Sequence, residues 1–184
     1  MAVGVLALQG CVEPHLRMLE RIGRKTKLVQ TVAHLAGVDR LILPGGESTT
    51  MLKLLHSTGL FSALIKFSQT KSVWGVCAGA ILLAKQAASP EQESLNLLDI
   101  RAVRNFYGSQ LNSFEADVLV RPLSAELHVQ FIRAPKLEAL SPEVEVHAMH
   151  GDDQIFLQHG RIMATSFHIE LGDDTRLHRY FLEL

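Results

Sequence analysis

The chain has 184 residues, of which 47% are hydrophobic and 20% are charged, and its formal net charge is −1. This length fits a single domain with its own hydrophobic core, so we expect one domain over residues 1–184. The charges are scattered and nearly balanced, which excludes a strong electrostatic footprint for nucleic acid or for an anionic membrane. The expected partners are therefore small molecules or another protein.

The first half of the chain alternates short apolar runs with helical patterns. Residues 3–8 form a continuous apolar run that ends in Gln9-Gly10, as in a strand buried on both faces. Pro14 then stands where the first turn of a helix accepts proline. Strands are expected over 3–8, 27–32, 40–43 and 72–76, and helices over 14–22, 51–55, 61–67 and 78–85.

The second half of the chain has more strands and fewer helices. Strands are expected over 114–120, 127–132, 144–149, 154–157 and 162–167, followed by a closing amphipathic helix over 175–182. The strand–helix alternation predicts a central, mostly parallel sheet with helices on both faces, and the later strands predict antiparallel additions to it. Such sheets bind ligands at the carboxyl ends of their strands, where both glycine-rich turns, 44–46 and 75–79, fall.

The start of the chain and its apolar stretches bear on where the protein is found. Met1 to Leu6 has neither the basic region nor the small-residue cleavage site of a secretory signal. No apolar stretch approaches the roughly 20 residues that span a bilayer. We therefore expect a cytoplasmic protein, in which both cysteines, Cys11 and Cys77, carry free thiols.

The segment GVCAG at residues 75–79 lies between an expected strand and an expected helix. This is the pattern of a nucleophile elbow, in which glycines permit a tight turn around a strained central residue. The helix N-terminus would lower the pKa of the Cys77 thiol, and the Ala78 N–H would lie close to a developing oxyanion. A buried structural cysteine is the alternative, but the strand–turn–helix setting favours a nucleophile. Cys11 has no such setting and is interpreted as a packing residue.

A cysteine nucleophile needs a histidine that is close in space. His168 ends an expected strand and is followed, one residue later, by Glu170. A carboxylate so placed can fold back onto the imidazole, fix its tautomer and stabilise the imidazolium. A solvated turn with two polar residues is the alternative for this segment when it is considered alone.

The other histidines have plainer interpretations. His56 and His178 lie in helical patterns and are expected to be exposed or half-buried. His147 and His150 flank the end of a strand, and a metal site formed by these two would lack a clear third ligand.

Three motifs, PGGES, GVCAG and SFHIE, occur in this order, and with them the chain resembles the class I, triad-type glutamine amidotransferases, which have a flavodoxin-like α/β fold. Within that family the chain is most similar to the glutaminase subunits of the pyridoxal 5′-phosphate synthase complex. The segments that carry this likeness are 4–10, 41–51, 75–85, 104–116, 131–135 and 164–171.

The resemblance implies an activity and a set of site residues. It implies hydrolysis of L-glutamine to L-glutamate and ammonia without a metal or organic cofactor. The ammonia passes to a separate synthase subunit that makes vitamin B6. The implied catalytic triad is Cys77, His168 and Glu170, the implied glutamine-binding residues are Gly46, Glu47, Ser48, Arg104, Ile132 and Arg133, and the implied oxyanion hole is formed by Gly45, Gly46 and Ala78. For the two arginines, a surface ion pair is the alternative role.

Two segments depart from the family pattern. Ile169 replaces the usual proline between the catalytic histidine and glutamate, which would loosen the turn that places Glu170. Residues 11–15, CVEPH, differ from the usual Ala-Val-x-Glu-His near the place where the family docks its partner. The docking surface is therefore less well determined by the resemblance than the triad is.

Three other functions are alternatives to this interpretation. The first is a glutaminase that feeds another pathway, such as histidine biosynthesis, and the segments 104–108 and 131–135 argue against it. The second is a catalytically silent subunit that only regulates its synthase, which the intact triad disfavours. The third is a cysteine hydrolase or chaperone of a related fold, which does not explain the PGGEST segment or the two arginines.

Overall fold

The structure is a computed structural model that describes residues 2–104, 106 and 113–184. Part of the motif segment 104–116, namely residues 105 and 107–112, lies outside the described residues. The helices are α1 (Val12–Arg21), α2 (Ser48–Ser57), α3 (Leu60–Ser68), α4 (Ala78–Leu83) and α5 (Arg176–Phe181), with short 3-10 turns η1 (Val32–Leu35) and η2 (Arg121–Leu123). The strands are β1 (Ala2–Leu6), β2 (Thr26–Val29), β3 (Val38–Leu43), β4 (Ser72–Val76), β5 (Ala84–Ala88), β6 (Leu98–Val103), β7 (Phe114–Val120), β8 (Ala125–Phe131), β9 (Lys136–Ala139), β10 (Glu145–His150), β11 (Asp153–His159) and β12 (Ile162–Thr165).

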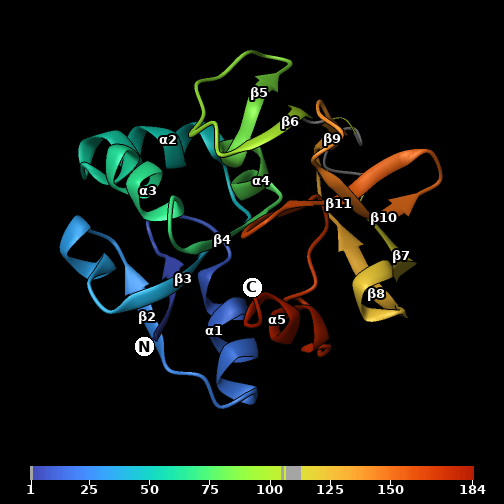
Figure 1. Cartoon of the computed structure of the whole chain (residues 1–184), viewed down its shortest axis with the longest axis horizontal. Coiled ribbons are helices and arrows are strands. Elements are labelled where there is room, and N and C mark those ends of the chain that lie inside the picture. The colour runs from blue at the N-terminus through green and yellow to red at the C-terminus, as the bar shows by residue number, and fades with distance from the viewer. Residues whose placement is uncertain (1, 105, 107–112) are drawn as a thin grey trace.

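A ten-stranded mixed sheet forms the centre of the molecule (Figure 1). Its order is β2-β1-β3-β4-β12-β11-β9-β6-β5, with β10 paired to β11, and β7 and β8 form a separate hairpin. The strands from β2 to β12 in this order run parallel, whereas β11 and β9 run antiparallel to their neighbours. The expected mixed sheet with a parallel centre is therefore confirmed.

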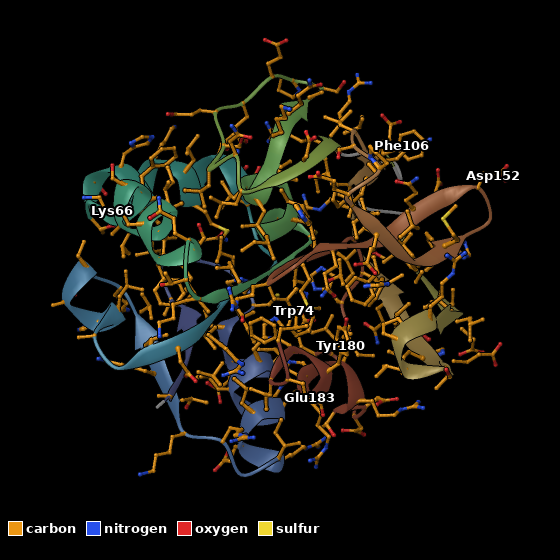
Figure 2. All side chains as sticks on the ribbon, in the orientation of Figure 1. Lys66, Trp74, Phe106, Asp152, Tyr180 and Glu183 are labelled. Carbon is orange, nitrogen blue, oxygen red and sulfur yellow. The ribbon has the colours of Figure 1, made fainter. Side chains whose placement is uncertain are left out.

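Helices cover both faces of the parallel part, as expected. Helices α2, α3 and α4 lie on one side, and α1 and α5 lie on the other (Figure 1). Side chains alternate between the two cores along a strand: Leu41 and Leu43 of β3 join the first core, while Ile42 joins the second. The second core is richer in aromatic rings, and Trp74 of β4 is fully buried within it (Figure 2).

Several expected boundaries are wrong. The helix expected over 78–85 ends at Leu83, and the chain continues directly into β5, which pairs with β6. Neither β5 nor β6 nor β9 was expected, because sequences such as AKQAA have little strand propensity of their own and become strands through pairing. The strand expected over 27–32 stops at Val29, and Val32 begins η1.

Among the described residues, no helix is long and apolar enough to cross a membrane.

Candidate active site

The turn between β4 and α4 holds Cys77 in a strained conformation. Its backbone has φ 50° and ψ −103°, outside the regions that a residue with a side chain normally adopts. Two backbone hydrogen bonds fix it, from Cys77 N–H to Thr165 O at 2.8 Å and from Ile81 N–H to Cys77 O at 3.2 Å. A Cβ atom at Gly79 would collide with the Leu43 carbonyl oxygen, so the glycine lets α4 begin directly against β3. The elbow pattern expected from the sequence is therefore the local structure.

His168 and Glu170 follow β12 and meet in a buried pair. The His168 backbone is anchored to β8, donating to Gln130 O at 2.7 Å and accepting from Gln130 N–H at 3.1 Å. Its Nδ1 lies 2.6 Å from Glu170 Oε1, and both side chains are almost fully buried. The carboxylate therefore fixes the tautomer with hydrogen on Nδ1 and leaves Nε2 for the nucleophile.

The pKa values of this pair follow from its contacts. Burial opposes the charged form of His168, but hydrogen bonds with Cys77 and Glu170 raise its pKa well above 6.5. Burial likewise opposes the charge on Glu170, yet His15 and His168 together lower the pKa of this carboxyl below its usual value. The arrangement therefore favours an imidazolium held between the Cys77 sulfur and the Glu170 carboxylate.

The glycine turn after β3 packs against the ring of His168. A Cβ atom at Gly45 would collide with His168 Cε1, so this close approach requires glycine. The Gly45 carbonyl accepts a hydrogen bond of 2.8 Å from the Cys11 N–H. Because the N–H of a trans peptide points away from its C=O, this bond also fixes the direction of the Gly46 N–H.

A pocket of about 300 Å³ opens beside Cys77. It is lined by Gln9, Gly10, Cys11, Gly46, Glu47, Ser48, Cys77, Ala78, Ile81, Arg104, Ile132, Arg133 and His168. The structure thus brings the expected glutamine-binding residues to one cavity with two members of the expected triad. Gly45 and Glu170 lie behind this lining, against His168.

Polar contacts organise the rim of the pocket. Glu47 caps α2, and hydrogen bonds from Thr49 and Thr50 outweigh the effect of burial and lower the pKa of Glu47 to about 2. Its own N–H donates to Gln9 Oε1 at 2.9 Å. Arg104 lies 3.6 Å from the Glu47 carboxylate. The ion pair that was the alternative role for this arginine is therefore present, and it lies at the rim of the pocket rather than on the open surface.

Residues 132–133 form the opposite side of the pocket. The Cys77 sulfur lies 3.8 Å from the Ile132 carbonyl oxygen. Arg133 has a positive φ of 45°, which is unusual for a residue with a long side chain. Strained backbone is common where a carbonyl or N–H must face a ligand.

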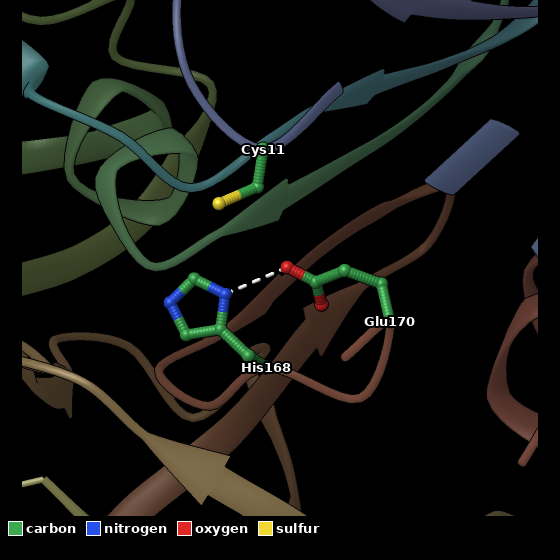
Figure 3. A group of neighbouring side chains, drawn as sticks. All are labelled: Cys11, His168 and Glu170. Carbon is green, nitrogen blue, oxygen red and sulfur yellow. Dashed lines mark hydrogen bonds and ion pairs between the residues drawn. The ribbon is translucent and has the colours of Figure 1, made fainter. Parts of the chain in front are cut away.

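Cys11 is more than a packing residue. It is half-buried, lines the pocket, and extends toward the His168–Glu170 pair (Figure 3). Possible ligand atoms of Cys11, His168 and Glu170 lie within 4.8 Å of one another. A metal ion bound there would compete with the hydrogen bond between His168 and Glu170, so this group overlaps the triad and forms no separate site.

Sequence reasoning missed Gln9 and Gly10 as pocket residues and misjudged one histidine. His178, expected to be exposed or half-buried, is fully buried, as is His15. The signal for His15 was its place on α1, at helical spacing from the buried Met18 and Leu19. His178 had a comparable signal, because it lies three residues before the buried Phe181 on α5, but its contact with His15, 163 residues away, has no local signal.

Comparisons with known proteins agree with this geometry. The model of the SNO glutamine amidotransferase family matches residues 5–184. The "Pyridoxal 5'-phosphate synthase subunit PdxT" of Roseiflexus sp. (strain RS-1) is 49% identical over the full length of both chains, and that of Brevibacillus brevis is 44% identical over all of this chain and 97% of its own. A crystal structure of a glutamine amidotransferase is 45% identical with a TM-score of 0.94, covering 100% of this chain and 98% of that one. The chain belongs to the SNO glutamine amidotransferase family.

Proposed function

We propose that this chain is the glutaminase subunit of a pyridoxal 5′-phosphate synthase, with residues 1–184 acting as one glutaminase domain. It hydrolyses L-glutamine and delivers the ammonia to a synthase subunit. The observation that carries the proposal is the His168–Glu170 pair, 2.6 Å apart, beside a strained Cys77 at a pocket. Family membership and relatives named as synthase subunits supply the substrate and the pathway.

The first half of the reaction is acylation. The Cys77 thiolate attacks the carboxamide carbon of glutamine, and N–H groups of Ala78 and Gly46 hold the resulting oxyanion. The His168 imidazolium gives its proton to the departing nitrogen. The C–N bond breaks, ammonia leaves, and a thioester remains on Cys77.

The second half is hydrolysis of the thioester. Neutral His168 takes a proton from water, and the hydroxide attacks the thioester carbon. The C–S bond then breaks, which releases glutamate and restores the thiolate and the imidazolium. Glu170 stays ionised throughout and keeps His168 Nδ1–H directed toward itself.

Substrate recognition follows from the charges of an amino acid. The α-carboxylate of glutamine fits Arg104 or Arg133 and nearby backbone N–H groups, and its α-ammonium fits Glu47 and backbone carbonyls such as that of Ile132. Glu47, with its low pKa, is ionised at any physiological pH. The elongated side chain then reaches Cys77 at the bottom of the pocket.

The free subunit should be a poor glutaminase that its partner activates. An uncoupled glutaminase wastes substrate, because free ammonia is lost to protonation and diffusion. The Gly45–Gly46 peptide is the natural switch, since a flip redirects its N–H and requires only the 2.8 Å bond from Cys11 N–H to be broken. Loss of one oxyanion donor costs on the order of a hundredfold or more in turnover.

The synthase would dock where ammonia leaves the pocket. Gln9 and the exposed Glu13 lie at this edge, whereas His15, once expected to belong to the docking surface, is fully buried. We place the reaction in the cytoplasm, where glutamine and a reduced Cys77 are both available.

A glutaminase assay with and without the purified synthase subunit tests the proposal. Glutamine turnover should rise at least about tenfold when the synthase is added, as restored oxyanion binding requires. Glu13→Lys should weaken the response, and Glu20→Lys, an exposed charge reversal near the other end of α1, is the matched control. Activity in the isolated chain that is high and unchanged by the synthase would refute the activation, and absence of glutaminase activity under both conditions would refute the function.

A further inference from the structure

Two buried histidines lie directly behind the catalytic carboxylate. His15 comes from α1 and His178 from α5, and neither side chain is exposed. His15 Nδ1 lies 3.0 Å from His178 Nε2, and His15 Nε2 lies 3.7 Å from Glu170 Oε1. Both rings also meet the buried Trp74 edge-on, with centroid distances of 5.6 and 4.9 Å. The mechanism described above uses neither histidine.

The contacts fix which nitrogen carries hydrogen in each ring. Glu170 is a carboxylate and can only accept, so we assign a hydrogen to Nε2, the His15 nitrogen that faces it at 3.7 Å. A neutral His15 then has a free lone pair on Nδ1, and the nitrogen of His178 that faces it must be Nε2–H. The donors therefore run in one direction, from His178 to His15 and from His15 to Glu170.

Both histidines should be neutral. Burial lowers the pKa of His15, and the neighbouring His168 lowers it further despite the attraction of Glu170. Burial and His15 lower the pKa of His178 to about 3. A second imidazolium beside His168 would share one carboxylate in a site without solvent, which is costly.

The other charged and titratable groups around Glu170 are also known. Cys11, at the start of α1, lies on the pocket side. It is not among the groups that shift the pKa of His15 or of His178. On the outer side a small cavity next to Glu170 is lined by Arg17, Arg21 and Asp173, of which Arg21 and Asp173 pair with each other. Arg17 and Arg21 also belong to α1, but among the described residues neither has a hydrogen bond or ion pair with Glu170.

Glu170 has room for a second donor. Its Oε2 and the Nε2 of His15 are both buried and have no hydrogen-bond partner among the described residues. Buried polar atoms without partners are rare and costly. The separation of 3.7 Å to Oε1 is longer than a hydrogen bond, but a shift of less than about 1 Å would close it.

We propose that His15 and His178 are positioning residues for the glutaminase reaction: His15 Nε2–H holds Glu170 ionised and aimed at His168, and His178 fixes the tautomer of His15. This inference rests on the proposed function for its kinetic consequences, but the tautomers themselves do not depend on it. The histidine pair also supplies a rigid support for Glu170 where Ile169 replaces the family's proline.

Three substitutions at His15 separate positioning from packing. His15→Gln keeps a donor near Nε2, His15→Asn keeps only the group that faces His178, and His15→Leu keeps neither. In the complex with the synthase, His15→Asn and His15→Leu should lower kcat about ten- to a hundredfold, the range found when a group behind a functional histidine is removed. KM should stay within about twofold, and His15→Gln should recover most of the loss.

The pH profile gives a signature that lost packing would not. Without the His15 N–H the carboxyl of Glu170 is protonated more easily, so its pKa rises. As the pH falls, His168 then loses its anionic partner at a higher pH than in the wild-type chain. The acid limb of the kcat/KM profile should therefore move to higher pH in His15→Asn and His15→Leu. If the acid limb stayed at the wild-type pH and kcat fell equally in all three His15 variants, the proposal would be overturned.

Imidazole ¹⁵N NMR of the wild-type chain decides the tautomers without any activity. At neutral pH both His15 and His178 should carry one hydrogen, on Nε2, while His168, as an imidazolium, carries hydrogen on both Nδ1 and Nε2. A doubly protonated His15, or hydrogen on Nδ1 of either ring, would overturn the relay. If the synthase complex released no ammonia at all, the proposed function would fail, and the NMR result would still decide this inference.

Discussion

Two turns of this molecule end a buried parallel strand, begin a helix, and bring a cysteine to the same pocket. Cys11 follows β1 and caps α1 with φ −79° and ψ 61°, whereas Cys77 follows β4 with φ 50° and ψ −103°. Burial raises the pKa of the Cys11 thiol. Cys77 instead hydrogen-bonds with His168, whose pKa rises as a result.

On the proposed mechanism, proximity to His168 and Glu170 is not enough to make a cysteine the nucleophile. Cys11 extends toward the same histidine and glutamate, but toward the side where they bond to each other (Figure 3). The strained elbow places the other thiol at the free nitrogen of His168 and at a helix N-terminus. Backbone geometry therefore separates the two cysteines, and the predictions below test that separation.

The largest effect is expected at Cys77. Cys77→Ala should reduce ammonia release in the synthase complex by at least about 10⁴-fold, because it removes the thiol that forms the thioester in the proposed mechanism. Cys11→Ala is the matched control and should retain most of the activity. The measurement is the initial rate of glutamate formation. The interpretation of the two turns is wrong if Cys11→Ala is the inactive variant.

The next largest effect is expected at Glu170. Glu170→Gln keeps the shape but removes the charge that orients His168, and loss of such a carboxylate costs about 10³- to 10⁴-fold in kcat. A trace of activity and near-normal folding should remain, which kinetics and circular dichroism would show. Wild-type rates in Glu170→Gln would exclude the assigned role.

Alkylation should discriminate between the two thiols by pH. Burial raises the pKa of Cys11 above its ordinary value of 9.0, so very little of its reactive thiolate is present near pH 7. A raised pKa of His168 keeps its imidazolium beside Cys77 at neutral pH and supports reaction there. With iodoacetamide or diazo-oxo-norleucine near pH 7, peptide mapping should find the adduct on Cys77. Adducts confined to Cys11 would contradict the comparison.

The smallest effect is expected at Ile169. Ile169 is only 1% exposed and packs in the aromatic core, so Ile169→Pro loses buried methyl groups and should destabilise the chain by about 1–2 kcal/mol. Activity should be unchanged or modestly raised, because the family places proline here. Denaturant unfolding and turnover measure the two effects, with Ile169→Val as the packing control. A large loss of activity would show that the turn to Glu170 differs from the family's.

Much of the parallel core could be predicted from sequence. β4 has the expected bounds, and so does β7 of the separate hairpin, because runs such as SVWGV combine strand propensity with punctuation by turns. β5, β6 and β9 were not predicted, since charged or amide side chains interrupt each short run and each strand forms by pairing with another segment of the chain. The elbow and the His-x-Glu segment could be predicted from the sequence because their geometry is local.

The contact between His15 and His178 behind Glu170 could not be predicted from the sequence. His15 and His178 are 163 residues apart and meet only because α1 and α5 lie side by side on one face of the sheet (Figure 1). Polar residues on helical patterns are normally exposed, so the pattern alone favoured the wrong environment for His178. Tertiary packing, rather than any motif, creates this pair.

Trp74 gives the histidine pair an optical signal. It is the one tryptophan in the chain, its indole N–H donates to Thr165 Oγ1 at 3.1 Å, and its ring meets both His15 and His178. A protonated imidazole quenches indole emission far more strongly than a neutral one. Because both rings are neutral near pH 7, an acid titration of the intrinsic fluorescence would report, without any label, the pH at which either buried ring gains a proton.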